Sequence, residues 1–385
     1  MRGKGYIVPI ILRVLLHFFE QFSSIPKETK NWISVRIFHK DRKHQIIKSL
    51  PKSNQDHLAV FAIYPGTTPL DSVLRIVESL QKQKYSVLAV INKNKNSARF
   101  ISALEEKQCA IMVRENIGAD FGAYQSGIRY LKKIGLYTNL KFLVLVNDSI
   151  FVTPISQQSI AKISNPISEL NCLFVHHQGI SHAGSMFLKF DHQTLISKEF
   201  SRFWNRYFPY LRKRRIILHG EHKLSKVVGI EKFYPIVSLD AINHIENYKL
   251  LDSEVLQLLT WSRKSSSLIH FYISKSIEVS NWIEVYSYTL SNLQVSNALG
   301  LNISRVLQVP LKMDLMKLGL VSAIDYLLLA RESGCMDDEV LELQKILNTK
   351  GGFLTDSLVK RTLKIYSMPG PNSSSRVPNR LHDDY

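Results

Sequence analysis

Polar and flexible side chains gather in one short segment, "VRENIGADFGAYQSGIRYL" (residues 113–131). The segment separates an apolar run from a helical pattern, which places Asp120 where a helix begins. The amino terminus of a helix favours anions, and Gly118 permits a positive φ or the close approach of a ligand. With Arg114, these residues indicate a site that grips a polar ligand. The alternative is structural: Asp120 caps the helix and Arg114 pairs with a surface acid.

A second segment, "FLVLVNDSIFVTP" (142–154), places Asp148 directly after an apolar run. Carboxylate and hydroxyl oxygens in such a position suit Mg²⁺ or Mn²⁺, and such an ion can neutralise a diphosphate. The alternative is an Asn-Asp-Ser turn, in which the side chains bond to their own backbone. Neither segment contains a Walker motif or GxGxxG, so glycine spacing alone does not predict nucleotide binding here.

Alternating strands and helices are expected around both segments. The pattern predicts strands at 57–64, 85–92, 109–114 and 141–147 and helices at 68–83, 97–107 and 121–135, with Thr68 as an N-cap. Such alternation favours a parallel sheet with right-handed crossovers, whose ligands bind outside the carboxyl ends of the strands. Each of those ends carries polar or glycine residues; the ends are Tyr64-Pro65-Gly66, Ile91-Asn92, Arg114-Glu115-Asn116 and Asn147-Asp148-Ser149.

Six motifs occur in order between about residues 61 and 229: "FAIYPG", "RENIGADFGAYQSGI", "LVNDSIFVTP", "GSMFLKF", "FSRFW" and "HGEHKLSKVVG". This arrangement resembles the rhamnan synthesis protein F family, which is associated with bacterial polysaccharide and lipopolysaccharide assembly. The resemblance covers a little under half of the chain. It implies an α/β fold: a GT-A-like, Rossmann-type, mostly parallel sheet flanked by helices. After about residue 240, apolar stripes and few glycines predict a mainly α-helical C-terminal region.

The resemblance also implies an activity, that of a glycosyltransferase using a nucleotide-sugar donor, with rhamnose as one candidate sugar. The acceptor would be a growing glycan or lipid-linked glycan of the bacterial cell surface. Asp120 would contact the nucleotide, and Asp148 would stand where GT-A enzymes place a metal-binding acidic motif, although "NDS" departs from the usual Asp-x-Asp. The expected donor-binding residues are Tyr64, Pro65, Asn92, Arg114, Asn116, Gly118, Asp120, Tyr124, Asn147 and Ser149, with Asp148 as ligand of a divalent cation.

The segment "HGEHKLSKVVG" (219–229) holds a candidate catalytic base just before a helical pattern. An inverting transferase needs one base to deprotonate the acceptor hydroxyl, and Glu221 is our candidate, with His219 and His222 as alternatives. The structural alternative is a helix-start glutamate that favours the helix dipole. A third nearby metal ligand is missing, which argues against a His/Glu/His metal site. His176, His177 and His182 are interpreted as loop or acceptor-side residues.

Composition places limits on the class of protein. The 385 residues are 45% hydrophobic, enough for a sizeable core, and carry a formal charge of +18, which fits phosphate-bearing substrates, nucleic acid or an anionic membrane. Three scattered cysteines predict neither a disulfide framework nor a zinc site and favour a reducing cytosol. We expect a glycosyltransferase domain at 51–240, a helical region at 241–366 and a disordered tail at 367–385.

The first 50 residues form a separate apolar and basic segment. "YIVPIILRVLLHFFEQF" is shorter than the about 20 apolar residues that span a bilayer. Ten Lys or Arg against three Asp or Glu between Met1 and Lys48 fit a peripheral contact with the inner face of the plasma membrane. The alternative is an amphipathic helix docked on the domain.

Two other functional classes stay open at this point. One is a scaffold without catalytic activity in a polysaccharide assembly complex. The other is a nucleic-acid-binding protein, for which "YFPYLRKRRIILH" (207–219) is the one dense mixture of basic and aromatic residues. Because that segment suits a sugar diphosphate or lipid phosphate equally well, we expect no nucleic-acid partner.

Overall fold

The computed structural model describes residues 25–36, 43–51, 55–165, 170–176, 180–237, 308–313 and 323–350. Residues 1–24 of the expected membrane-associating segment, His177, most of the expected helical region and the expected tail lie outside these ranges. Within them, no helix has both the length and the apolar character needed to cross a membrane.

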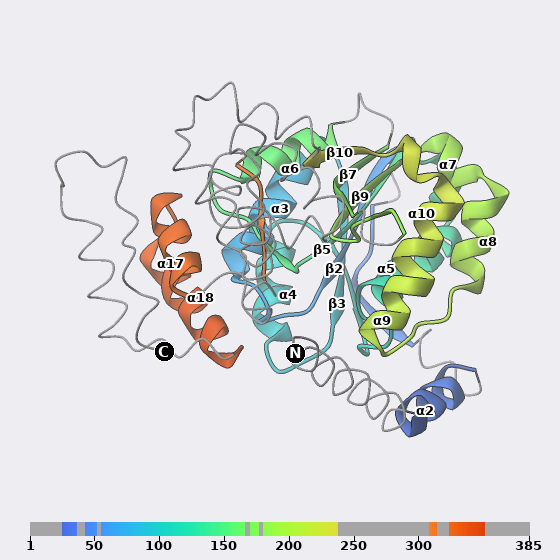
Figure 1. Cartoon of the computed structure of the whole chain (residues 1–385), viewed down its shortest axis with the longest axis horizontal. Helices are drawn as coiled ribbons and strands as arrows, with labels where there is room; N and C mark the ends of the chain where they lie inside the picture. The colour runs from blue at the N-terminus through green and yellow to red at the C-terminus, as the bar shows by residue number, and fades with distance from the viewer. Residues whose placement is uncertain are drawn as a thin grey trace, which may run out of the picture.

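A parallel sheet forms the centre of the molecule (Figure 1). Its four parallel strands stand in the order β4-β3-β2-β5 and are β2 (His57–Ile63), β3 (Ser86–Asn92), β4 (Ala110–Arg114) and β5 (Phe142–Asn147). Three helices connect them: α3 (Leu70–Lys82), α4 (Ser97–Glu106) and α5 (Ala119–Lys133). These seven elements confirm the predicted alternation, with boundaries that differ by one or two residues.

The sheet is mixed at both edges. On one side β1 (His44–Lys48) pairs antiparallel with β4. On the other side β9 (Phe187–Asp191) pairs antiparallel with both β5 and β7 (Asn171–His176). Strand β8 (His182–Ala183) also pairs antiparallel with β7. Strand β10 (Tyr234–Val237) pairs parallel with β7. The fold is therefore α/β and Rossmann-like, with a mostly parallel mixed sheet.

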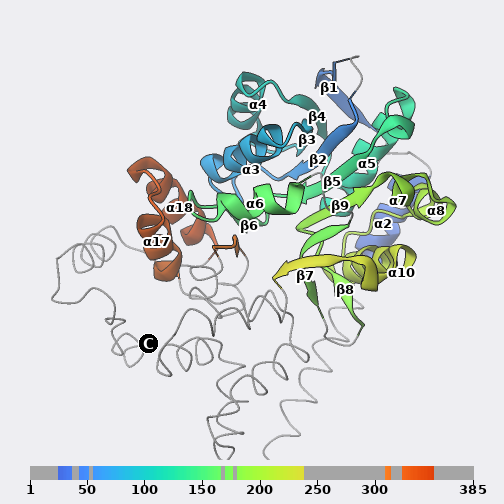
Figure 2. The ribbon, with the colours of Figure 1, turned by 90° about the horizontal axis from the view of Figure 1, so that it is seen from above.

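Helices cover both faces of the sheet, each over its own apolar core (Figure 2). One core packs the sheet against α3, α4 and α6 (Gln157–Ser164), through side chains such as Val73, Phe100 and Ile160. The other packs it against α5, α7 (His192–Ile196), α8 (Lys198–Arg206), α9 (Lys213–Ile216) and α10 (Lys223–Val228). Apolar residues on both faces explain why the central strands are continuous hydrophobic runs.

The C-terminal part that the structure describes packs beside α3 and α6. Strand β11 (Leu311–Lys312) pairs antiparallel with β6 (Ile150–Phe151), just after the "NDS" segment. Helices α17 (Ala323–Glu332) and α18 (Asp337–Thr349) form a third apolar cluster that includes Phe151. Arg75 of α3 and Glu339 of α18 form a bidentate ion pair across this contact.

One expected helix cap is wrong. Helix α3 begins at Leu70 with Pro69 at the N-cap position and no side-chain capping bond. The hydroxyl of Thr68 instead donates to the main-chain oxygen of Asp148, because Thr68 is buried against the end of β5. Thr68 therefore ties the loop before α3 to the residue that follows β5.

Candidate functional site

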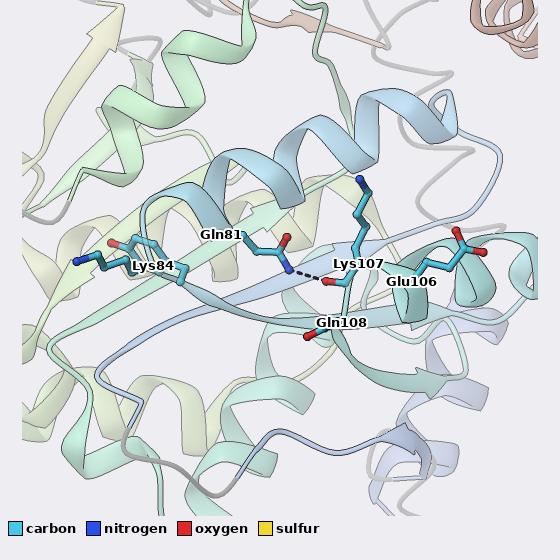
Figure 3. A pocket seen from close by; sticks show the side chains of 6 residues that line it. Gln81, Lys84, Glu106, Lys107 and Gln108 are labelled. Carbon is cyan, nitrogen blue, oxygen red and sulfur yellow. Dashed lines mark hydrogen bonds between the residues drawn. The ribbon is translucent and has the colours of Figure 1, made fainter.

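Several predicted site residues lie at one edge of the sheet, because the carboxyl ends of parallel strands point the same way. A surface depression at the opposite edge is lined by the ends of α3 and α4 and by the loops that follow them, through Gln81, Lys84, Glu106, Lys107 and Gln108 among others (Figure 3). It lies far along the strands from the polar cluster and takes no part in the site described below.

The turn before α5 has the predicted left-handed glycine. Gly118 has φ +82°, and the following Ala119 has φ +48°. A Cβ on Gly118 would lie 2.4 Å from the Cβ of Pro209, so both its conformation and its packing require glycine. The turn sets Asp120 in the first turn of α5, where its Oδ1 accepts from the amide of Phe121 at 2.9 Å.

Glu221 lies inside a continuous helical segment, so the expectation that it precedes a helix is wrong. Helix α9 continues through a π-helical turn, η3 (Ile217–His222), into α10. The wider π turn accommodates Gly220, whose Cβ would lie 3.0 Å from the ring of Phe121. Since Phe121 follows Asp120, this close approach brings Glu221 to the Asp120 turn. Such π turns are frequent at functional sites.

A serine hydroxyl joins the two carboxyl groups. Ser185 Oγ lies 2.9 Å from Asp120 Oδ2 and 2.6 Å from Glu221 Oε1. The side-chain amide of Asn147, at the end of β5, donates to the same Asp120 oxygen at 3.1 Å. The three segments around residues 120, 185 and 221 therefore meet in one hydrogen-bonded cluster.

Burial shifts the acidity of this cluster. Burial, followed by the charge of Glu221, raises the pKa of Asp120 to about 6. Burial also raises the pKa of Glu221, although the Ser185 hydroxyl and the charges of Lys312 and Lys213 act in the opposite direction. Carboxyl groups that titrate closer to neutrality are suited to proton transfer at physiological pH.

Asp148 forms a second polar centre beside the first. Its Oδ2 accepts from the main-chain amide of Tyr64 at 2.7 Å and from the Thr67 hydroxyl at 3.1 Å. Lys350, which follows α18, donates to the main-chain oxygen of Thr67 at 2.8 Å. Burial raises the pKa of Asp148 to about 7, so the neutral acid is well populated at neutral pH.

These contacts do not fit a metal ligand. The donor set does not favour a cation, because one carboxylate oxygen of Asp148 already accepts two hydrogen bonds from the protein. Across the part of the chain that the structure describes, no group of three or more His, Cys, Asp or Glu residues could hold a metal ion. We therefore derive no chemical step through a divalent cation.

Four predicted donor-binding residues, Asn92, Arg114, Tyr124 and Asn147, are buried and bonded within the protein. Arg114 donates to Asn92 Oδ1 at 3.0 Å and to the main-chain oxygen of Ile117 at 2.6 Å, which holds the turn before α5. Tyr124 is fully buried and donates to the main-chain oxygen of Ser185 at 2.8 Å. The contacts of these side chains position the turn and Ser185.

The other predicted donor-binding residues differ in accessibility. Asn116 and Tyr64 are exposed beside the cluster, whereas Pro65 is buried. Ser149 is half-buried, and its main-chain amide donates to Asn147 Oδ1 at 3.1 Å.

The histidines fall into two environments. His219 is half-buried and stacks on Tyr210 with ring centroids 4.7 Å apart, and its pKa is lowered by burial. His222 lies 4.3 Å from the ring of His182, and burial lowers its pKa too. His176 and His182 lie on strands β7 and β8, not in a loop, and His182 Nε2 is 3.5 Å from Glu221 Oε2.

Sequence reasoning missed Ser185 as a site residue and assigned His182 no contact with Glu221. Ser185 lies in "GSMFLKF", one of the motifs that carried the family resemblance, so a signal existed. A serine next to a glycine is common in turns, however, and nothing local connects it to Asp120 or Glu221. Lys312 and Lys350 also come near the cluster from segments predicted only as helical.

Comparison with known proteins leaves the function open. No protein-family model matches the chain. A curated protein, "Uncharacterized protein y4gN" of Sinorhizobium fredii, is 29% identical over 201 residues, which are 49% of this chain. The chain spans about half, 51%, of the length of that relative.

Proposed function

We propose that this chain is a glycosyltransferase with a GT-A-like fold. It would move a sugar from a nucleotide-sugar donor to a hydroxyl of a bacterial cell-surface glycan or lipid-linked glycan. One observation supports the proposal above all: Asp120 and Glu221, from two separate helices, meet on the Ser185 hydroxyl at the carboxyl edge of the parallel strands. That edge is where open α/β sheets bind ligands.

In this proposal Asp120 holds hydroxyl groups of the donor and Glu221 is the base. Glu221 takes the proton of the acceptor hydroxyl while the acceptor oxygen forms a bond to the anomeric carbon. The bond from that carbon to the diphosphate oxygen breaks, and the nucleoside diphosphate leaves with the electron pair. Inversion at the anomeric carbon follows from this single displacement.

Lysine side chains supply positive charge for the leaving diphosphate. Burial raises the pKa of Glu221 and of Asp148, and nearby ammonium groups counteract it. The charges of Lys312 and Lys213 lower the pKa of Glu221, and the charge of Lys350 lowers that of Asp148. Ammonium groups beside a diphosphate stabilise the charge that develops as it leaves. This role replaces the expected one of a cation held by Asp148.

The experiment that tests the proposal is a thermal-shift screen against nucleotide sugars, with and without Mn²⁺. A ligand that binds the native state raises the melting temperature, so we expect one nucleotide sugar to do so without added Mn²⁺. Asp120→Asn should reduce that shift, and Glu115→Gln, an exposed carboxylate on the same turn, should leave it unchanged. If none of the nucleotide sugars shifts the transition, a scaffold without catalytic activity becomes the better proposal.

Helix α2 (Ile25–Arg36) supports a peripheral contact with an anionic membrane. Its inner face docks through Asn31, which donates to the main-chain oxygen of Pro209 at 3.0 Å. Its outer face exposes Trp32 (52%) and Ile33 (37%), and the helix lies at the α9 end of the molecule (Figure 1). Exposed apolar side chains on a chain of charge +18 suit an anionic leaflet.

A further inference from the structure

Helix α9 and the π-helical turn η3 carry an exposed stripe of apolar and basic side chains. Its members stand at the spacing i, i+3, i+4 and i+7 of one helix face and are Leu211, Arg214, Arg215 and Leu218. All four are exposed, the two leucines to 45% and 48%. Ile216, between them, is buried in the apolar core. One side of this helical segment therefore packs on the sheet, and the stripe faces solvent.

Helix α2 exposes side chains of the same two kinds. Trp32, Ile33 and Arg36 are exposed and lie within one turn of each other. The guanidinium of Arg36 lies over the ring of Phe208, 5.7 Å from its centroid, and Phe208 stands three residues before Leu211. The exposed side chains of α2 and the stripe on α9 therefore adjoin one another at the α9 end of the molecule (Figure 1).

The charge and the chemistry of these side chains indicate what covers them. The segment 208–218 contains four basic residues and no acidic residue, and the whole chain carries a formal charge of +18. Leucine and tryptophan side chains can enter the boundary between lipid headgroups and acyl chains while neighbouring guanidinium groups reach the lipid phosphates. A nucleic acid would pair with the same charges but has no apolar phase to receive the leucines. The combination therefore fits an anionic membrane.

The stripe shares its helical segment with the proposed base. Leu218 and Glu221 both belong to η3 and stand three residues apart, which is about 5 Å along a helix axis. Amphipathic helices bury their apolar faces about 5–10 Å into the headgroup and acyl boundary. When Leu218 is buried in that way, Glu221 is held at about the level of the headgroups. A sugar hydroxyl carried on a lipid headgroup lies at the same level.

We propose that the acceptor of this site is a lipid-linked glycan and that the protein rests on the anionic leaflet that holds it. The surface that makes the contact, called here the α2–α9 surface, consists of Trp32, Ile33, Leu211, Arg214, Arg215 and Leu218. The inference deepens the proposed function and rests on it, because it assigns the acceptor to the site of Glu221. The chemical step is the displacement already described, with Glu221 taking the proton of the lipid-borne hydroxyl.

Co-sedimentation with vesicles tests the α2–α9 surface without any donor. The natural protein should bind vesicles of phosphatidylcholine with added phosphatidylglycerol, and bind vesicles of phosphatidylcholine alone far more weakly. Arg214→Gln/Arg215→Gln should weaken binding to the anionic vesicles by about thirtyfold, which is about fivefold for each charge removed. Leu211→Ser/Leu218→Ser should weaken it by at least about tenfold, because two half-exposed leucines no longer bury apolar surface.

Helix α18 offers a matched control, because it packs beside α3 and α6 and also exposes an apolar and a basic side chain. Leu341→Ser/Lys345→Gln should bind the anionic vesicles as the natural protein does. Equal binding of the natural protein and both double variants of the α9 stripe would overturn the proposal. Retardation of a labelled RNA oligonucleotide by a protein that does not bind vesicles would also overturn it, since the surface would then serve nucleic acid.

A second measurement tests the class of acceptor. Sugar label from the nucleotide sugar found in the thermal-shift screen should enter the lipid fraction that organic solvent extracts from bacterial membranes. Leu211→Ser/Leu218→Ser should lower this incorporation at least about tenfold and leave the thermal shift unchanged, because neither leucine belongs to the hydrogen-bonded cluster. Label that enters water-soluble glycan equally well with both proteins would overturn the lipid-linked acceptor. Vesicle binding by a chain that binds no nucleotide sugar would refute the glycosyltransferase proposal instead.

Discussion

The ion pair between Arg75 of α3 and Glu339 of α18 gives a sharp test of how the C-terminal helices support the site. Arg75 Nη1 and Nη2 lie 2.6 and 2.5 Å from the two carboxylate oxygens of Glu339. The side chain of Glu339 is 0% exposed and that of Arg75 is 14% exposed. Arg75 also donates to the main-chain oxygen of Val152 at 3.0 Å, so the pair joins α3 and α18 to the segment that follows β6.

Glu339→Gln removes the negative charge and keeps the shape of the side chain. Breaking a buried ion pair costs about 3–5 kcal/mol, because the remaining charge stays buried without its partner. The Gln carbonyl still accepts one bond and Arg75 is partly exposed, so we expect a loss near the lower end, about 3 kcal/mol. The free energy of unfolding from urea titration measures this loss.

The same helix offers a matched control. Glu342 also makes a bidentate contact, with Arg99 at 2.8 and 2.9 Å, but the side chain of Arg99 is 60% exposed. Glu342→Gln should therefore cost only about 0–1 kcal/mol, the usual range for exposed pairs. Equal losses in the two variants would refute the reasoning that burial decides the difference. A loss at Glu339 should also weaken donor binding, because α18 leads into Lys350 and its bond to Thr67 beside Asp148.

Four further predictions concern the site and its supports. Glu221→Gln should lower turnover by at least about a hundredfold with unchanged donor affinity, because the base is lost. Glu231→Gln is the control and should keep normal turnover. Near-normal turnover in Glu221→Gln as well would leave His219 and His222 as the candidate bases. The pKa of Asp148 rises on folding from 3.8 to about 7, so the folded chain holds a proton that the unfolded chain releases, and stability should fall as pH rises between those values. Asp148→Asn should flatten that slope in thermal unfolding measured across the window, and an unchanged slope would exclude Asp148 as its source. Gly118→Ala should destabilise the chain by more than the about 1–2 kcal/mol of a left-handed residue, because its Cβ also collides with Pro209, and a loss below 1 kcal/mol would contradict the turn geometry. Trp32→Ser should reduce the fraction of protein that sediments with anionic vesicles and should not change the fraction that sediments with neutral vesicles. If the variant and the natural protein sediment equally with anionic vesicles, α2 does not contact the membrane.

Local sequence patterns were sufficient for the central strands and for the turn at Asp120. The strands beginning at His57, Ser86, Ala110 and Phe142 are short apolar runs that alternate with amphipathic helices, and both patterns depend only on near neighbours. The left-handed conformation of Gly118 also follows from its place between a strand and a helix. The antiparallel insertion of β9 beside β5 had no such local signal, because strand pairing is decided by distant segments.

By itself the sequence determined the strand-helix alternation, the left-handed glycine and the acidic side chains at the strand ends, because each is encoded within a few residues. Only the tertiary structure decided which of these side chains meet. Ser185 is hydrogen-bonded to Asp120, 65 positions away in the sequence, and to Glu221, 36 positions away. Glu221 is brought there by a π-helical turn that the segment "HGEHKLSKVVG" does not indicate. Tertiary packing also buried Arg114 and Tyr124 among protein partners and raised the pKa of Asp148, since burial and hydrogen-bond geometry depend on the elements that pack around each residue.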